Sequence, residues 1–308
     1  MDSLLSIRVF CSVAELKSFT AAADRHGMST TMASKHVRAL ESRLGTRLLN
    51  RTSRHVSMTE TGALYFNQAR QTLDALDEVE AAVGNTTVVP RGTLRLAAPL
   101  WFDNPRFSAV LAEFCSLYPD VRFDIELTGR QVNLVEEGFD LMLPATLPGS
   151  LDPGLIARPL VDMPFHLVAS PALLDRVGRP GVLAALNGEP LLLCKGMHFG
   201  AQIPFEGPDG REVVRFQTAL ESVNESLLRR VAIEGMGLAL LPEILIEDDV
   251  ASGGLEMVLP GVARITTKIY AVYPSRKFLS AKVRRFIDFF NARVQQINRE
   301  RTVRLGAK

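Results

Sequence analysis

Residues 16–62 constrain the fold more than any other part of the chain, because they have the pattern of two short helices joined by a tight turn. Ser18 is a suitable N-cap for a first, alanine-rich helix that contains Thr20. The Gly-Met-Ser run at 27–29 then ends that helix and caps the next one. In residues 30–44 apolar side chains recur at helical spacing. The segment therefore predicts a helix-turn-helix.

The second of these helices has the side chains that a DNA-recognition helix needs. Its polar face offers hydrogen-bond donors and positive charge opposite an apolar stripe. Such a helix fits the major groove, where its N-terminal side chains reach base edges and its basic residues meet phosphate. The candidate contacts are Thr30, Thr31, Ser34, Lys35 and Arg38. An ordinary helical pair with a solvated basic face would give a similar pattern, so the next segment decides between the two.

Residues 47–59 mix basic side chains with short polar ones, which predicts a small hairpin, or wing, lying along the DNA backbone. Its candidate DNA contacts are Arg51, Thr52 and Arg54, and Ser18 and Thr20 complete the predicted DNA-binding set. His36 and His55 either add phosphate contacts or are exposed without a role. The wing favours DNA binding over a simple helical bundle.

The distribution of charge supports this interpretation. Residues 1–60 carry nine Lys or Arg and five acidic side chains, a surplus of four positive charges, whereas the whole chain carries +1. The rest of the chain is therefore net negative, and attraction for phosphate is concentrated in one domain. Binding driven by it should weaken steeply with salt, because counterions are released.

The same region resembles the LysR-type transcriptional regulators, and the resemblance extends over nearly the whole chain. Three segments depart from the family pattern: Lys17 where glycine is usual, Met32-Ala33 where Ala-Val is usual, and residues 142–145 where a strand usually leads to arginine. The motifs that carry the resemblance are Phe10, Ser18-Phe19-Thr20-Ala21-Ala22-Ala23, Ser34-Lys35, Leu40-Glu41, Leu44-Gly45, Leu48-Leu49-Asn50-Arg51 and Thr59-Glu60-Thr61-Gly62.

The resemblance implies an N-terminal all-α winged helix-turn-helix followed by a long linker helix, and a C-terminal α/β periplasmic-binding-protein-like effector domain with two subdomains. The expected divisions are 1–60 for DNA binding, 61–84 for the linker and dimerisation helix, 85–91 for a hinge and 92–308 for the effector domain. Subdomain I is expected at about 92–161 and 267–308, and subdomain II at about 162–266.

The pattern of the C-terminal part agrees with an α/β domain, because strands alternate with helices and so predict a parallel sheet. The expected strands are 93–98, 121–127, 155–160, 165–169, 191–194, 238–241 and 268–273, and the expected helices are 105–118, 225–235 and 281–294.

The linker helix has an apolar seam formed by Phe66, Ala69, Leu73, Leu76 and Val83. The resemblance implies that this helix pairs two subunits into a homodimer or homotetramer, so that two DNA half-sites are contacted together. The alternative is that the seam packs on its own domain.

The resemblance also implies a cleft between the subdomains that binds a small-molecule effector, which changes the oligomer on DNA. A helix start at Pro105 favours an anionic effector, whereas the missing arginine near 142–145 argues against one. Trp101, the only tryptophan, suggests an aromatic effector, although a core aromatic cluster gives the same sequence. The candidate effector-binding residues are Ala98, Leu100, Trp101, Phe102, Thr128, Cys194, Met197, His198 and Asn224.

Enzymatic chemistry is not expected. No metal-binding His spacing or Gly-x-Ser-x-Gly elbow occurs, and Gly235-Met236-Gly237 follows a helix, the reverse of a dinucleotide-binding order. The three cysteines are far apart, so neither a disulfide framework nor a zinc site is indicated, and buried free thiols are expected. Cys194 as a redox sensor remains an alternative.

We therefore expect a cytoplasmic transcriptional regulator without a cofactor, which binds double-stranded DNA and a small molecule and contacts RNA polymerase. No membrane span or signal peptide is predicted, because no run of about 18 apolar residues occurs. Two rival hypotheses remain: a solute-binding module carrying an N-terminal helical domain, and an α/β enzyme that uses the cleft for catalysis.

Overall fold

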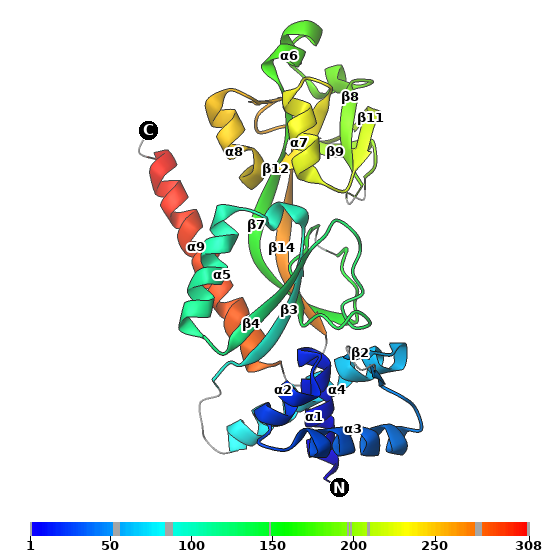
Figure 1. The fold of residues 1–308 in the computed structure, drawn as a ribbon. Coiled ribbons are helices and arrows are strands. Elements are labelled where there is room, and N and C mark those ends of the chain that lie inside the picture. Colours follow the sequence, from blue (N-terminus) through cyan, green and yellow to red (C-terminus); the bar gives the residue numbers. More distant parts are fainter. Residues whose placement is uncertain are drawn as a thin grey trace. The chain divides into compact units, whose positions relative to one another are not determined.

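The computed structural model describes residues 2–51, 56–83, 89–147, 149–195, 197, 199–207, 210–274 and 279–306 (Figure 1). The chain forms two compact units. Unit 1 contains Met1–Val89, Val135–Gly138 and Arg276–Ala281, and unit 2 contains Pro90–Leu134, Phe139–Ser275 and Lys282–Lys308. No helix in the described ranges is both long and apolar enough to cross a membrane.

Unit 1 contains a helix-turn-helix, a two-stranded wing and a long helix. The helix predicted at 30–44 is confirmed at Thr30–Leu44, and an additional N-terminal helix, not predicted from the sequence, precedes the helix-turn-helix. The elements are α1 (Ser3–Leu16), α2 (Phe19–Arg25), α3 (Thr30–Leu44), β1 (Leu49–Arg51), β2 (Val56–Met58) and α4 (Glu60–Val83).

The three short helices pack around one apolar core, to which each contributes its buried stripe. Phe10 of α1 and Val37 of α3 are fully buried there. His36 is also buried, and its Nδ1 lies 2.9 Å from the hydroxyl of Ser6 on α1. The idea that His36 contacts phosphate is therefore wrong: its ring is part of the joint between α1 and α3.

Lys17 ends α1 with a left-handed backbone, at φ 50° and ψ 28°. This conformation costs a residue with a Cβ about 1–2 kcal/mol, which explains why glycine is usual at this point. The departure seen in the sequence is thus a strained helix C-cap.

Replacing Lys17 with glycine is expected to raise the free energy of unfolding of unit 1 by up to about 1 kcal/mol, because relief of the strain exceeds the extra chain entropy of glycine. Chemical denaturation measures this gain. A Lys17→Ala variant removes the same charge but keeps the Cβ, and it should not be stabilised. An equal gain in both variants would contradict the backbone explanation.

The first half of the predicted dimer seam on α4 packs inside unit 1. Phe66, Ala69 and Leu73 are each 8% exposed and join the core formed by the short helices. For these three residues, the correct alternative is therefore that the seam packs on its own domain. Among the described side chains of this helix, the exposed large apolar ones are Leu64, at 59%, and Val79, at 37%, and the side chain of Val83 lies outside the described residues.

Unit 2 is an α/β domain built on one ten-stranded sheet, and the predicted fold class is confirmed. The neighbouring strands follow the order β11-β8-β12-β7-β14-β5-β3-β4, and β13 pairs with β7 and β6 with β14. The strands are β3 (Gly92–Ala98), β4 (Val121–Leu127), β5 (Leu141–Met142), β6 (Ala145–Thr146), β7 (Leu155–Ala169), β8 (Pro190–Cys194), β9 (Gln202–Gly207), β10 (Gly210–Arg215), β11 (Gln217–Ser222), β12 (Leu238–Pro242), β13 (Glu256–Met257) and β14 (Arg264–Pro274). β9 and β10 form a separate antiparallel hairpin.

The helices of unit 2 form two groups that the long strands β7 and β14 connect (Figure 1). One group contains η1 (Leu100–Phe102), α5 (Pro105–Leu117) and α9 (Ala281–Gly306). The other contains α6 (Pro171–Val177), η2 (Leu183–Leu186), α7 (Glu225–Ile233) and α8 (Glu243–Ser252). These groups fall within the residue ranges expected for subdomains I and II, and we use those names for them.

Two features of the sheet differ from the prediction. The sheet is mixed rather than parallel, because β7 and β14 run antiparallel to each other. In addition, β7 is continuous where two strands were expected, although it contains Pro159 and Pro164. Proline lacks an N–H group and normally interrupts a ladder. Here the register with β14 shifts between Ile269 and Tyr270, opposite Pro159, so the strand continues through an irregularity.

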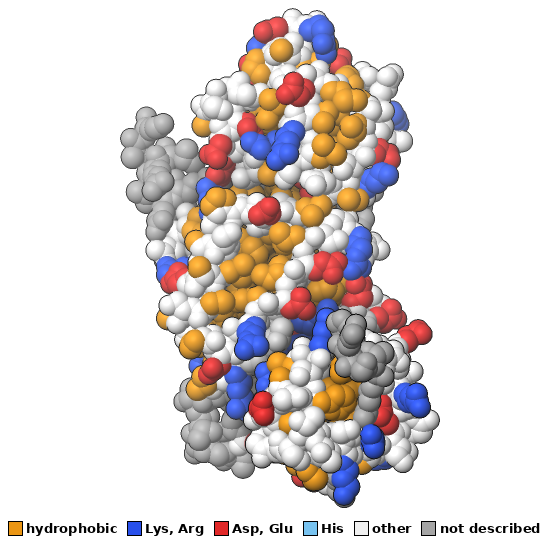
Figure 2. Space-filling view, viewed as in Figure 1, with side chains coloured by type: hydrophobic (Ala, Val, Ile, Leu, Met, Phe, Trp, Pro, Cys, Tyr) orange, Lys and Arg blue, Asp and Glu red, His pale blue; other side chains and the backbone are white. Residues whose placement is uncertain are grey.

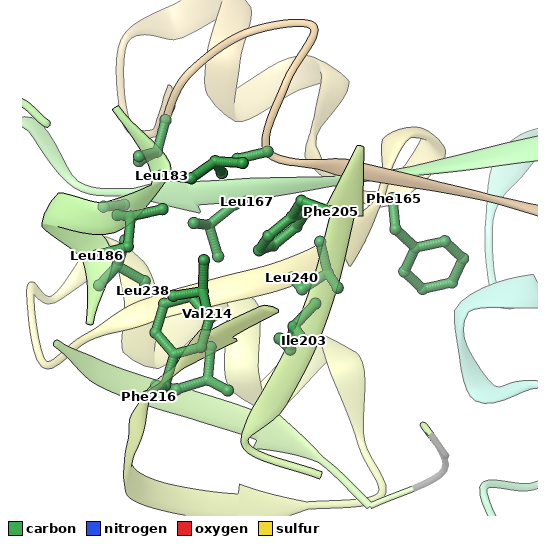
Figure 3. Close-up of a cluster of buried hydrophobic side chains, with 14 of the residues drawn as sticks. Phe165, Leu167, Leu183, Leu186, Ile203, Phe205, Val214, Phe216, Leu238 and Leu240 are labelled. Atoms are coloured by element: carbon green, nitrogen blue, oxygen red, sulfur yellow. The ribbon is translucent and has the colours of Figure 1, made fainter. Parts of the chain in front are cut away.

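The core of subdomain II lies between its part of the sheet and the β9–β10 hairpin (Figure 3). Leu167 from β7 and Leu240 from β12 meet Phe205 and Val214 from the hairpin there. This packing explains why the hairpin is present although it is not paired with the main sheet: its apolar face covers one side of that sheet.

Candidate nucleic-acid interface and ligand site

The first turns of α3 present the predicted recognition residues to solvent. Thr30, Thr31, Lys35 and Arg38 are exposed, and Ser34 is partly buried. Ser29 caps the helix, because its hydroxyl accepts a hydrogen bond from the backbone N–H of Met32 at 3.2 Å. Figure 2 shows Lys and Arg side chains over the part of unit 1 that contains α3. The opposite face of α3 packs in the core, so its polar face is held outward.

The wing is attached to α3 through a carboxylate that sequence reasoning did not single out. Glu41 Oε1 accepts hydrogen bonds from the backbone N–H groups of Leu48 and Leu49, at 3.0 and 3.1 Å. The other end of the wing is held by Thr59, whose backbone N–H donates to Leu48 O at 2.9 Å. The resemblance motif Leu40-Glu41 was the available signal. The wing therefore has a fixed position relative to the recognition helix.

Gly62 allows close packing between the start of α4 and the wing. Gly62 lies in the first turn of α4, and a Cβ built on it would be 1.9 Å from the carbonyl oxygen of Leu48. The Thr59 hydroxyl accepts from the Gly62 N–H at 2.9 Å and so caps α4 at the same place. Only a residue without a side chain fits where the helix meets the wing.

Of the other DNA-binding candidates, the structure describes the side chains of only Ser18 and Thr20. Ser18 uses its hydroxyl to cap α2, accepting from Ala21 N–H at 3.2 Å, and Thr20 is exposed on that helix. The backbone of Arg51 lies in β1. Its side chain, together with Thr52, Arg54 and His55, lies outside the described residues, so the predicted wing contacts stay predictions.

The structure brings five of the effector-binding candidates to the carboxyl ends of parallel strands, where open α/β sheets bind ligands. Thr128 N–H donates to Ala98 O at 2.9 Å, which joins the ends of β3 and β4. Met197 N–H donates to Cys194 O at 3.1 Å at the end of β8. We call these residues the strand-end group: Ala98, Thr128, Cys194, Met197 and Asn224.

The strand-end group comes from the ends of β3 and β4 and from the ends of β8 and β11, and these two sets of strand ends are in contact at Gly129. A Cβ on Gly129 would lie 2.5 Å from Val223 O and 2.7 Å from Val223 Cβ, so the loop after β4 meets the loop after β11 directly. Lys195 N–H donates to Ser222 O at 3.0 Å and ties that loop to β8. Sequence reasoning named Thr128 but gave no signal of this contact.

A buried carboxyl group lies beside Cys194. Glu225, the first residue of α7, is 8% exposed, and its Oε1 accepts from Cys194 Sγ at 3.6 Å. Its Oε2 is buried and has no hydrogen-bond partner among the described residues. Burial raises the pKa of the Glu225 carboxyl above its ordinary value, and the hydrogen bonds from its own backbone N–H and from the Cys194 thiol only partly offset this rise.

Because the native pKa of Glu225 is raised, folding takes up a proton above pH 4.5, and the native state loses stability relative to the unfolded chain as pH rises through the native pKa. A Glu225→Gln variant should therefore be more stable than the wild type at neutral pH. The two proteins should converge below the ordinary carboxyl pKa of 4.5.

Thermal unfolding of both proteins across this pH range measures the difference. Glu234→Gln, at the exposed end of the same helix, serves as the control for removing a carboxylate. A stability difference for Glu225→Gln that does not change with pH would contradict the assignment.

Trp101 and Phe102, which were also effector-binding candidates, are not members of the strand-end group and lie in another part of subdomain I. Both are 3% exposed, and their ring centroids lie 4.7 Å apart. Phe102 meets Phe107 of α5 at 5.0 Å and Phe290 of α9 at 6.4 Å. Both residues thus belong to an aromatic cluster between η1, α5 and α9. Leu100 of the same turn is partly buried, and His198 lies outside the described residues.

The cysteines are free thiols in different surroundings. Cys11 and Cys194 are buried as expected, whereas Cys115 is partly exposed. Burial raises the pKa of the Cys11 thiol to about 12, so this side chain is protonated at neutral pH. In the described part of the chain no group of His, Cys, Asp or Glu is arranged to hold a metal ion.

Two family models match the chain. The model described as "Bacterial regulatory helix-turn-helix protein, lysR family" matches residues 4–63, and the "LysR substrate binding domain" matches residues 88–295. Together they cover the helix-turn-helix, the wing and nearly all of unit 2.

Several relatives match the chain over nearly its whole length. PtxR, an HTH-type transcriptional regulator from Pseudomonas aeruginosa, is 33% identical over 291 residues, which cover 93% of this chain and 91% of that protein. An uncharacterised HTH-type regulator from Haemophilus influenzae is 32% identical over 285 residues, covering 92% and 98%. The structure of CrgA, a LysR-type transcriptional regulator from Neisseria meningitidis, is similar with a TM-score of 0.56 at 28% identity, covering 95% of this chain and 98% of that chain.

Proposed function

The chain belongs to the LysR family of DNA-binding transcriptional regulators, and we propose that it binds its operators as a homodimer or homotetramer whose geometry on DNA changes when a small molecule binds in unit 2. It has the helix-turn-helix and the effector-binding domain of that family. Such a regulator acts on the chromosome in the cytoplasm, and transcription control would include contact with RNA polymerase.

The observation that carries the proposal is the exposed face of α3 beside an anchored wing. Thr30 and Thr31 lie at the helix N-terminus, where side chains reach base edges, and Lys35 and Arg38 follow one and two turns later. The hydrogen bonds that the Leu48 and Leu49 N–H groups donate to Glu41 hold the wing next to this helix, so both can contact one duplex. Arg38 is proposed to contact a base or phosphate, and Lys35 a phosphate.

Sequencing of genomic fragments retained by the full-length protein tests operator recognition. The protein is incubated with sheared DNA from its own organism and washed at moderate salt. We expect enrichment of a few dyad-symmetric sites near genes that respond to one class of metabolite. Uniform or absent retention would contradict the regulator proposal and favour the solute-binding alternative.

We propose that pairing of subunits involves the outward face of α4. Leu64 is 59% exposed and Val79 37%, on a helix whose other face fills the core of unit 1. Exposed apolar side chains on one helix face are typical of a protein–protein contact. Two paired helix-turn-helix units would then contact two half-sites about one turn of DNA apart.

Leu64→Asp is expected to shift the wild-type dimer toward monomers and to weaken binding to a two-half-site operator at least tenfold, because a carboxylate would be buried in the interface. Sedimentation velocity measures the first effect and gel-shift titration the second. Val182→Asp, which replaces a 63% exposed valine in subdomain II, is the control. A Leu64→Asp protein that keeps the wild-type mass and affinity would rule out this face.

The effector is proposed to bind at the strand-end group, between the subdomains. There the Gly129–Val223 contact joins the ends of β4 and β11, so a ligand that separates or clamps these loops would favour one arrangement of the subdomains. The buried Glu225 and the Cys194 thiol offer polar atoms close to this position. No cofactor is required for this function.

A further inference from the structure

Unit 2 contains a second candidate ligand site, separate from the strand-end group. It is a pocket of about 90 Å³ beside β7 and β14, the strands that connect the two subdomains; we call these two strands the hinge strands and the cavity the hinge pocket. No member of the strand-end group lines it. Its lining comes from η1, α5 and α9 on one side, from α8 on the other, and from residues 161–164 and Ile269 of the hinge strands.

One wall of this hinge pocket is apolar and rigid. Trp101, Phe102, Phe107 and Phe290 line it and pack on one another, with the Phe102 and Phe107 rings at 87°. Phe107 and Phe290 also meet edge to face, at 6.2 Å between centroids. Such a wall accepts the apolar body of a small molecule and buries its surface from water.

The opposite side of the hinge pocket is acidic. Glu243 and Glu247 of α8 line this side, Asp162 of β7 lines the floor, and Arg106 of α5 lines the pocket from the side of the aromatic wall. Arg106 Nη2 lies 2.5 Å from Glu247 Oε2, and Lys268 Nζ lies 2.6 Å from Asp162 Oδ1, so both of these cations are already engaged. Among the described lining residues, carboxylates still outnumber cations. An anionic ligand would therefore meet like charges, whereas a cation would be attracted.

A buried histidine adds polarity behind this acidic side. His166 is 8% exposed, and its Nε2 lies 3.6 Å from Glu243 Oε1 without a hydrogen bond to any described residue. The side of the pocket toward α8 thus contains hydrogen-bonding groups as well as charge. The pocket is amphipathic, with an aromatic wall facing carboxylates.

We propose that the hinge pocket binds a small amphipathic cation, a protonated amine on an aromatic or aliphatic body. The apolar body lies against Trp101 and Phe102, and the ammonium group faces Glu243 and Glu247. This site is distinct from the effector site proposed above and does not depend on DNA binding.

Ligand binding in the hinge pocket is coupled to the arrangement of the subdomains. Subdomain I provides α5 and α9, subdomain II provides α8, and the strands between them form the floor. Rotation of one subdomain relative to the other changes the distance between the aromatic wall and the carboxylates. A ligand that touches both sides has different affinities for the two arrangements, and it therefore shifts their populations.

The only tryptophan of the chain lines the hinge pocket, which provides a direct measurement on the full-length protein. We use 2-phenylethylammonium as the probe and 3-phenylpropionate as an anion of similar size. Titration of Trp101 emission is expected to saturate with the amine, with at least tenfold higher affinity than with the carboxylate. No saturable change with the amine, or equal affinity for the two probes, would overturn the proposal.

Charge variants locate the bound amine. Glu243→Gln and Glu247→Gln should each weaken amine binding at least threefold, and together they should remove most of the preference over the anion. Asp248→Asn is the matched control, because Asp248 is exposed on the same helix and does not line the pocket. Thermal unfolding confirms that each variant is folded. Wild-type amine affinity in the folded double variant would overturn the assignment to this pocket.

Discussion

Replacing Gly62 with alanine is expected to lower the free energy of unfolding of unit 1 by about 3 kcal/mol and to abolish specific DNA binding. The added Cβ would lie 1.9 Å from Leu48 O and 2.8 Å from Leu48 C, well inside contact distance. A backbone carbonyl, unlike the end of a flexible side chain, cannot turn away. Either α4 or the wing must move.

The atoms around Leu48 make this movement costly. Glu41 holds the N–H of Leu48 and of Leu49, and Thr59 N–H is bonded to Leu48 O. Displacing the carbonyl therefore disturbs three hydrogen bonds and moves the wing away from α3. The variant should lose DNA binding even at temperatures where its helices remain folded.

Thermal unfolding followed by helical circular dichroism tests the stability effect, and gel-shift titration tests DNA binding. For a unit of this size about 3 kcal/mol corresponds to a decrease of at least about 12 °C in the midpoint. Gly181→Ala is the control, because nothing lies within 4 Å of its Cβ position and its backbone is not in the left-handed region. A Gly62→Ala midpoint equal to that of Gly181→Ala would contradict the close approach.

The elements of unit 1 that could be predicted are those with a local signal in the sequence, such as apolar periodicity and capping residues. The predicted span 30–44 agrees with α3, because apolar periodicity, the Ser29 cap and Gly45 all indicate the same boundaries. By contrast, α1 was not predicted. Its inner face includes Ser6 and Ser12, which are buried because their hydroxyls pair with His36 and His26, at 2.9 and 2.8 Å. Polar residues that are buried through distant partners interrupt the apolar pattern on which a sequence prediction depends.

The site in unit 2 was predictable only in part, for a geometric reason. Strand ends meet wherever parallel strands are adjacent, so Ala98 and Thr128 could be placed together from the sequence. Leu100, Trp101 and Phe102 were expected at the effector site after the strand 93–98, but they form the 3₁₀ turn η1. This turn places Trp101 and Phe102 among aromatic rings of α5 and α9, which are distant in sequence. The hinge pocket depends on that tertiary packing.

Arg38 and Lys35 provide the most direct test of how this regulator binds DNA. Arg38→Ala is expected to weaken specific operator binding by about 1–3 kcal/mol if its guanidinium contacts a base, with a smaller loss on random duplexes. Lys35→Ala is expected to weaken binding to both duplexes to a similar degree, because a phosphate contact carries no sequence information. Both side chains are exposed on α3, so neither change should alter the core of unit 1.

Titrations at several salt concentrations separate these roles. Each lost phosphate contact reduces the slope of log K against log salt by about 1, so Lys35→Ala should show a flatter dependence. Arg38→Ala should keep the wild-type slope if its main contact is a base. Arg122→Ala, which removes an exposed cation from β4 in unit 2, is the control for total charge.

The combination of the two measurements distinguishes three outcomes for Arg38. A selective loss with an unchanged slope identifies base recognition, because a hydrogen-bonding partner is lost without a change in counterion release. Equal losses on operator and random DNA with a flatter slope make Arg38 a phosphate contact. Wild-type affinity on both duplexes, with Arg122→Ala also unchanged, would mean that the exposed face of α3 is not in the groove, and the wing alone would then have to carry recognition.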